Sequence, residues 1–177
     1  MRVVSISVNG LRQAIENGFF DWLEGQDADV VCVQDHRVRV RDVEDDPSLV
    51  PPDYQAYFID GENTEDGGVG IYTRHMPKAI IYGFGYGPAD QQGRYIQADF
   101  DRVSVASVMA PSALEDDQHQ AVKNDFMAAF VGFLRKNLGK RRQFIFCCAL
   151  QTAHHVTDTI SRFDKLEVSG FLRHERA

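Results

Sequence analysis

The chain has 177 residues, 44% of them hydrophobic, which is enough to bury one core in one domain. Its formal net charge of −7 argues against tight, unaided binding to DNA or RNA, because phosphate neutralisation by Lys and Arg dominates such affinity. The first residues show no charged leader with an apolar stretch, and no apolar run reaches the roughly 18–20 residues that span a bilayer. We therefore expect neither a secretory signal nor a membrane helix.

Three cysteines, Cys32, Cys147 and Cys148, make an odd count, and two of them are adjacent on a predicted strand. Adjacent strand residues point to opposite faces of a sheet, so a disulfide framework is not expected. Free thiols fit a reducing compartment, and we expect a cytoplasmic protein.

The first third of the chain predicts a strand–helix–strand unit. Hydrophobic spacing indicates a strand over Arg2–Val8, a helix over Leu11–Glu24 and a buried strand over Ala28–Val33. The next segment, Arg37–Asp53, is polar and holds three prolines, which is typical of a long loop.

Short strands dominate the middle of the chain. Gly, Asp and Pro punctuation predicts five of them, over Tyr54–Ile59, Val69–Thr73, Ala79–Phe84, Tyr95–Phe100 and Val103–Met109. A second helix over His119–Leu138 and a strand over Gln143–Cys148 follow. We expect one sheet with both predicted helices packed on the same outer face.

Six blocks, in order, resemble those of the exonuclease III/AP-endonuclease family of the endonuclease/exonuclease/phosphatase superfamily. They are Met1–Arg12, Val30–Asp35, Gly67–Arg74, Gly93–Asp99, Phe144–His154 and Ser169–Arg176. The resemblance spans essentially the whole chain. It implies an α/β (α+β sandwich) protein with the four-layer α/β/β/α fold, here one C-terminally incomplete domain over residues 1–177.

The resemblance also implies which strands and residues are missing. The family continues with strands that carry a final Asp and an Asp-His pair for metal binding and base catalysis. Without those strands, one face of the first sheet would lack its usual partner, and an uncovered apolar face favours self-association.

Several positions that the resemblance marks as catalytic hold other residue types. Ser7 replaces an Asn, Met109 a Tyr, Ala149 the Asp that helps to activate the nucleophile, and Gln151 the Asn that orients the phosphate. Asp35 stands where the family has a metal-binding Glu. It is the residual candidate ligand, although a lone Asp at a strand end is also typical of a turn. With so few ligands we expect no catalytic residues, no metal and no cofactor.

Within the superfamily, the strand-end Gln34-Asp35 most resembles the catabolite repression control proteins of pseudomonads and relatives. That resemblance implies a catalytically inactive post-transcriptional co-repressor, with the RNA chaperone Hfq and an A-rich messenger RNA as partners. The alternative is a divergent Mg²⁺-dependent phosphodiesterase or DNA-repair endonuclease that uses Asp35. A shortened remnant without independent function is a third hypothesis.

A basic cluster ends the second predicted helix and continues into the loop that follows. Its members, the candidate contacts to RNA or to a protein partner, are Arg135, Lys136, Lys140, Arg141 and Arg142. Cations at this place also satisfy the carbonyl groups of a helix C-terminus, so an ordinary solvated helix end explains them equally well. In either case we expect weak or no autonomous binding to nucleic acid.

Overall fold

The computed structural model describes residues 1–61, 67–113, 117–158 and 169–176. Within these ranges, eight strands form two four-stranded sheets. The first has the order β1-β2-β4-β3, with β1 at Val3–Ser7, β2 at Val30–Gln34, β4 at Val69–Thr73 and β3 at Gln55–Ile59. The second has the order β5-β6-β7-β8, with β5 at Ala79–Tyr82, β6 at Tyr95–Asp99, β7 at Val103–Met109 and β8 at Gln143–Ala149.

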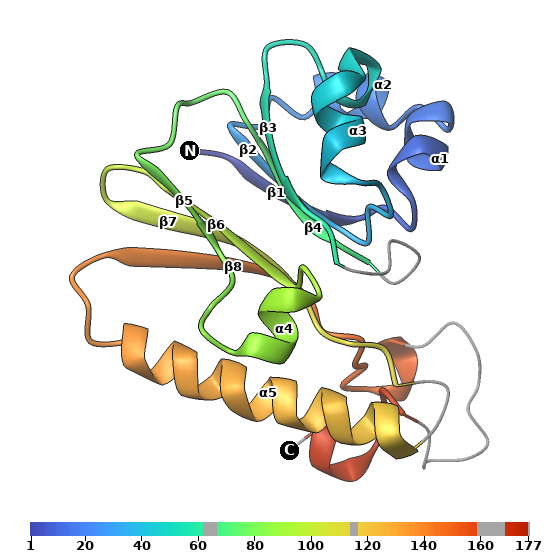
Figure 1. Ribbon diagram of the computed structural model, residues 1–177, viewed down its shortest axis with the longest axis vertical. Helices are drawn as coiled ribbons and strands as arrows, with labels where there is room; N and C mark the ends of the chain where they lie inside the picture. Colours follow the sequence, from blue (N-terminus) through green and yellow to red (C-terminus); the bar gives the residue numbers. More distant parts are fainter. Residues whose placement is uncertain (62–66, 114–116, 159–168, 177) are drawn as a thin grey trace.

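The two sheets pack face to face between helices. Helices α1 (Leu11–Glu16), α2 (Phe19–Glu24) and α3 (Val40–Asp45) cover the outer face of the first sheet (Figure 1). The long helix α5 (Asp117–Asn137) covers the outer face of the second, beside the short α4 (Gly87–Gln91) (Figure 1). The expected four-layer α/β/β/α fold is confirmed.

The expectation of one sheet with both helices on the same face is wrong. Every residue of β2 and of β4 is buried, so these strands need cover on both faces. The helices provide it on one side, and residues of β6 and β7 provide it on the other, among them Ile96, Ala98 and Val105. The resemblance had suggested that the inner face of the first sheet is uncovered. In the structure the second sheet covers it. Self-association stays a prediction without that basis.

Local details depart from the predicted elements for simple reasons. The first helix is interrupted at Gly18, whose φ of +87° is a left-handed conformation that ends α1 and allows α2 to start in a new direction. The predicted loop Arg37–Asp53 contains α3 and a 3₁₀ turn, Pro47–Leu49, because Val43 and Leu49 bury against the outer helical layer. Two further 3₁₀ turns lie at Val156–Asp158 and Arg173–Glu175. None of the helices in the described ranges is long and apolar enough to cross a membrane.

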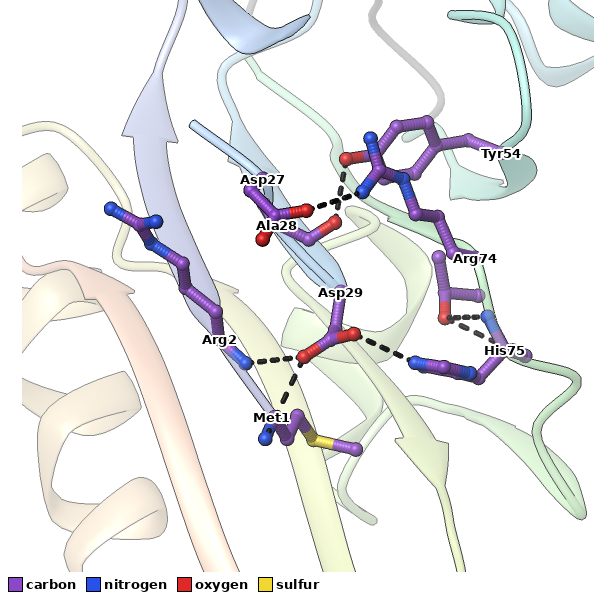
Figure 2. Close-up of polar contacts among 9 residues, drawn as sticks. Met1, Arg2, Asp27, Ala28, Asp29, Tyr54, Arg74 and His75 are labelled. Carbon is purple, nitrogen blue, oxygen red and sulfur yellow. Dashed lines mark hydrogen bonds and ion pairs between the residues drawn. The ribbon is translucent and has the colours of Figure 1, made fainter. Parts of the chain in front are cut away.

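The amino-terminal ends of β1 and β2 are fastened to the end of β4 by a polar cluster around Asp29 (Figure 2). The Asp29 carboxylate accepts from the backbone N–H of Arg2 and lies 2.8 Å from His75 Nε2. The pKa of Asp29 is lowered to about 2, first by the bond with His75 and then by that with Arg2. Next to it, Tyr54 donates its hydroxyl to the carbonyl of Ala28 at 2.6 Å. The polar side chains at this end of the first sheet thus hold neighbouring strands together.

Candidate functional site

Two pairs of parallel strands end at one side of the sandwich. Ser7 of β1 lies opposite Gln34 of β2, and Met109 of β7 lies opposite Ala149 of β8. The side-chain amide of Gln34 donates to Ser107 Oγ at 2.9 Å, so the carboxyl ends of β2 and β7 meet across the sandwich. Ligands of open α/β sheets bind outside the carboxyl ends of strands. The residues gathered there, which we call the strand-end site, are Ser7, Asp35, Arg37, Gly67, Arg94, Met109, Ala149 and Gln151.

Asp35 is the acidic group of this site. It follows β2 directly, with a left-handed φ of +57° that turns the chain away from the strand. Its two carboxylate oxygens accept hydrogen bonds from Nε and Nη2 of Arg37, each at 2.9 Å. The Asp35 side chain is 11% exposed and that of Arg37 43% exposed, so the cation forms the solvent side of the pair. Asp35 is therefore held in place and already charge-paired.

A second arginine, Arg94, reaches the same place from the position just before β6. Gly67 has a φ of +125°, and a Cβ atom built there would lie 3.1 Å from both Arg94 Nη1 and Met109 Sδ. The Gly67 carbonyl accepts from the backbone N–H of Arg37 at 2.9 Å, which joins this group to the segment after Asp35. Arg94 is 7% exposed and donates from Nε to Gln92 Oε1 at 3.3 Å. The strand-end site thus holds the largely buried guanidinium of Arg94. A side chain at position 67 in place of glycine would crowd it.

Ala149 and Gln151 complete the site from β8. Ala149 ends the strand, and its methyl group can neither accept a proton nor bind a metal ion. Gln151 is exposed and has a left-handed φ of +54°. Its backbone carbonyl accepts from the buried ammonium group of Lys123 at 2.7 Å, and that ammonium also contacts Glu175 Oε1 at 2.6 Å. A buried ion pair therefore fixes the turn that presents the Gln151 amide.

The oxygen ligands of the site are few. Among the residues that the structure describes, no group of three or more His, Cys, Asp or Glu side chains is arranged to hold a metal ion. Asp35 is the acidic member of the strand-end site, and Ser7 adds a neutral hydroxyl. Mg²⁺ commonly keeps several waters and binds through one or two carboxylates plus substrate phosphates. These residues therefore fit only a Mg²⁺ ion that keeps several waters and also binds the substrate phosphates, with Asp35 as its protein ligand.

His36 is a feature of the site that sequence analysis missed. Its side chain is fully buried, and burial lowers its pKa to about 4. The backbone N–H of Val38 donates to Nδ1 at 3.2 Å, which leaves Nε2–H to donate to the carbonyl of Ile59 at 3.0 Å. This neutral ring fixes the segment that carries Asp35 and Arg37. A histidine directly after Asp35 was the available signal, but its burial was not evident from the sequence.

The predicted basic cluster lies elsewhere. Arg135, Lys136, Lys140 and Arg141 are exposed at the end of α5 and in the turn that follows. This turn leads into the first residue of β8, whereas the strand-end site lies at the last residue of β8. At the rise per residue of a β-strand, the two ends of β8 are about 20 Å apart.

The fifth member, Arg142, differs from the rest. It is half-buried, donates from Nε to Ser104 Oγ at 2.6 Å and lies 3.7 Å from an oxygen of Asp99. It also donates to the carbonyl of Phe100. The prediction of Arg142 as a surface contact is corrected, because its guanidinium ties the start of β8 to β6 and β7.

Comparison with known proteins agrees with the geometry. A profile described as Endonuclease/Exonuclease/phosphatase family matches residues 8–147. The chain belongs to this family. It is 27% identical over 177 residues to an exodeoxyribonuclease of Bacillus subtilis, covering 99% of this chain and 68% of that protein. It is 26% identical to a DNA-(apurinic or apyrimidinic site) endonuclease of Dictyostelium discoideum, covering 99% of this chain and 48% of that protein.

Solved structures show the same fold. An AP endonuclease from Archaeoglobus fulgidus superposes with a TM-score of 0.80 at 20% identity, over 99% of this chain and 67% of that one. A 3'-5' exonuclease from Neisseria meningitidis gives a TM-score of 0.79 at 20% identity, over 99% and 68%. The chain thus spans between about half and two thirds of the length of these family members.

These comparisons correct one expectation. The chain was expected not to be an enzyme, on the strength of Ala149 and Gln151. The family is enzymatic, and the relatives that match 99% of this chain are named as an exodeoxyribonuclease and an AP endonuclease. The family resemblance is confirmed at the level of exonuclease III/AP-endonuclease-like proteins, and the closer kinship to catabolite repression control proteins is not shown.

Proposed function

We propose that this chain is a divergent Mg²⁺-dependent phosphodiesterase that acts on DNA, of the repair-nuclease kind. The observation that carries the proposal is the convergence of one carboxylate, Asp35, and two guanidinium groups, Arg37 and Arg94, in a chain of this family. They meet where the carboxyl ends of β2 and β7 lie beside the amino-terminal end of β6. Cleavage of a phosphodiester requires that negative charge on the phosphate be stabilised, and guanidinium groups match phosphate oxygens in geometry and charge.

Asp35 is the residue that would hold the cation. Mg²⁺ would supply a positive charge against the phosphate oxygens and polarise a bound water. The Arg37 guanidinium, which is 43% exposed and pairs with both Asp35 oxygens, would have to release the carboxylate for this. Arg37 would then face the phosphate.

The remaining groups affect how the phosphate is oriented and how fast the phosphodiester is hydrolysed. The exposed side-chain amide of Gln151 can donate to a phosphate oxygen. The turn that carries Gln151 is stabilised by the hydrogen bond from Lys123 to its backbone carbonyl. Ala149 offers no general base at the end of β8, and such a group contributes roughly 10²–10⁴ in rate. We therefore propose slow hydrolysis. Binding to DNA should also be weak and salt-sensitive, because the chain carries a net charge of −7.

The test is cleavage of end-labelled duplex DNA containing an abasic site, with purified protein in excess. We expect scission in Mg²⁺ that stops in EDTA and slows as salt rises. Equal scission in Mg²⁺ and EDTA, or no scission at any protein concentration, would overturn the proposal. An abasic-free duplex and a single-stranded RNA of the same length, run in parallel, show which backbone is attacked.

A co-repressor role on Hfq and A-rich messenger RNA is a second proposal, which the exposed cations Arg135, Lys136, Lys140 and Arg141 favour. Local basic groups suffice if a partner supplies most of the phosphate affinity. Reversing Lys140 and Arg141 to Glu should weaken assembly on an Hfq–RNA complex at low salt and have little effect on stability, since both are exposed. Equal assembly by the double variant and the parent would leave these residues as a solvated helix end.

A further inference from the structure

The three cysteines lie in two different environments. Cys32 of β2 and Cys147 of β8 both point into the core between the two sheets, where Cys32 is fully buried and Cys147 is 8% exposed. Cys148, the next residue on β8, points the other way and packs in the core under α5. The strand-end site uses none of the three. The structure therefore sets two thiols from different sheets apart from the third.

The two sheets approach each other closely beside this pair. Stacked sheets usually lie about 10 Å apart. Here Ser107 of the second sheet donates its hydroxyl directly to the backbone carbonyl of Val33 in the first, at 2.9 Å. The Gln34 side chain likewise reaches the backbone carbonyl of Cys147, at 3.3 Å. Cys32 directly precedes Val33, and Cys147 is the register partner of Ser107, so both cysteines lie where the gap is narrow.

The Cys32 and Cys147 side chains interact in the core between the two sheets, and the Ser5 side chain of β1 also interacts with Cys147. These contacts lower the pKa of Cys147, chiefly because the Cys32 thiol donates to it. Burial raises the pKa of Cys148 to about 11. Since the thiolate is the form that reacts, Cys147 is the better nucleophile of the two on β8.

Access also favours Cys147. Ser5 is exposed on β1, which is the outer strand of the first sheet among those described, and β8 has the same place in the second. Cys147 is 8% exposed and Cys32 is fully buried, so a small, neutral oxidant reaches Cys147 more readily than Cys32.

We propose that Cys32 and Cys147 form a redox-active dithiol that a hydroperoxide converts into a disulfide between the two sheets. The Cys147 thiolate attacks the peroxide, its sulfur becomes a sulfenic acid, and the displaced hydroxide takes up a proton to leave as water. The Cys32 thiol then attacks that sulfur, loses its proton and releases a second water as the S–S bond forms. Two thiols and one hydrogen peroxide thus give one disulfide and two waters, and a dithiol reductant reverses the change.

The test is disulfide mapping on the native protein, which depends on no variant. The protein is treated with hydrogen peroxide, its remaining thiols are blocked with N-ethylmaleimide under denaturing conditions, and its peptides are analysed without reduction. We expect free thiols to fall from three to one per chain, with a peptide pair joined through Cys32 and Cys147 and full recovery after dithiothreitol.

Two variants give matched controls. Cys148→Ser should keep the cross-link, because Cys148 faces α5, and Cys147→Ser should abolish it and leave Cys32 reduced. Circular dichroism checks that both variants are folded. A cross-link that contains Cys148, one that joins two chains, or retention of all three thiols in peroxide would overturn the inference. None of these results depends on whether the protein cleaves DNA.

Discussion

Asp35 and Arg37, separated by one residue, form a two-point ion pair in which each carboxylate oxygen accepts from a different guanidinium nitrogen at 2.9 Å. In the proposed function this pair is the resting state of the site, and Mg²⁺ must displace the arginine. The strength of the pair therefore sets how much cation is needed.

Replacing Arg37 by Gln should ease metal binding. A partly exposed ion pair contributes about 0.2–1 kcal/mol, so its loss should raise the affinity for Mn²⁺ or Mg²⁺ by up to about fivefold. Isothermal titration of Mn²⁺ into the protein without DNA measures this, so that the proposed contact of Arg37 with phosphate does not enter. Arg41→Gln is the matched control, because Arg41 is 79% exposed and lies 3.9 Å from Asp42 instead. An unchanged or weaker affinity in Arg37→Gln would show that Asp35 is not the cation ligand.

Replacing Ala149 by Asp should speed cleavage. The substitution puts a carboxylate at the end of β8, where it can accept a proton or join Asp35 in holding the cation. We expect a rate increase of about tenfold or more in single-turnover assays, and none in Ala149→Ser, which adds a neutral group of similar reach. If both variants were folded and neither changed the rate, the end of β8 would not face the reacting phosphate.

The glycine pair Gly68 and Gly132 should respond to alanine in opposite directions. Gly68 has a φ of +86°, and a Cβ there would lie 2.4 Å from Nε2 of the buried His36. We expect Gly68→Ala to lower the free energy of unfolding by about 2–4 kcal/mol. Gly132 lies inside α5 with nothing within 4 Å of its Cβ position, so Gly132→Ala should raise it by about 0.5–1 kcal/mol. Urea unfolding compares the two; a neutral Gly68→Ala would mean that His36 is loosely packed.

Buried His36 should make stability fall in mild acid. Burial lowers its pKa from 6.5 to about 4 in the folded protein, so between those values the unfolded chain binds the proton more tightly. Stability from this group is full above pH 6.5 and declines toward pH 4, by about 3 kcal/mol in total. Urea unfolding measured across this range tests it, with His36→Asn expected to flatten the profile.

The acid response of Asp29 occupies a separate window. Its pKa is lowered from 3.8 to about 2, so its contribution is present above pH 3.8 and is lost as the pH falls through about 2. A stability loss confined to pH below 3.8 would therefore point to carboxyl groups such as Asp29 and not to His36.

The strands and the family were predictable from the sequence, because alternation and turn residues are local signals. β4 and β7 have the predicted bounds. The division into two sheets was not predictable from them. It depends on which strands pair, and the apolar residues of β2 and β6 look alike whether they bury against a helix or against another sheet. Tertiary packing decides whether a strand face is covered by a helix or by another sheet, and tertiary packing is not a local property of the sequence.

The site was partly predictable for the same reason. Asp35, Met109 and Ala149 were placed correctly at strand ends, since each follows or ends an apolar run. The role of Arg37 as the partner of Asp35 depends on left-handed backbone at both residues, and the burial of His36 depends on Phe58 and Gly68 from distant strands. Such contacts arise only when the chain is folded.

The most direct measurement for the proposed function is the single-turnover rate of abasic-site DNA cleavage in Mg²⁺ by the native protein and by Asp35→Asn, purified in the same way. The variant keeps the size of the side chain and removes the charge that would hold the cation. We predict that the native protein cleaves and that the variant is at least about tenfold slower, with both equally folded by circular dichroism. Equal rates in the two proteins, or no Mg²⁺-dependent cleavage by the native one, would contradict the account.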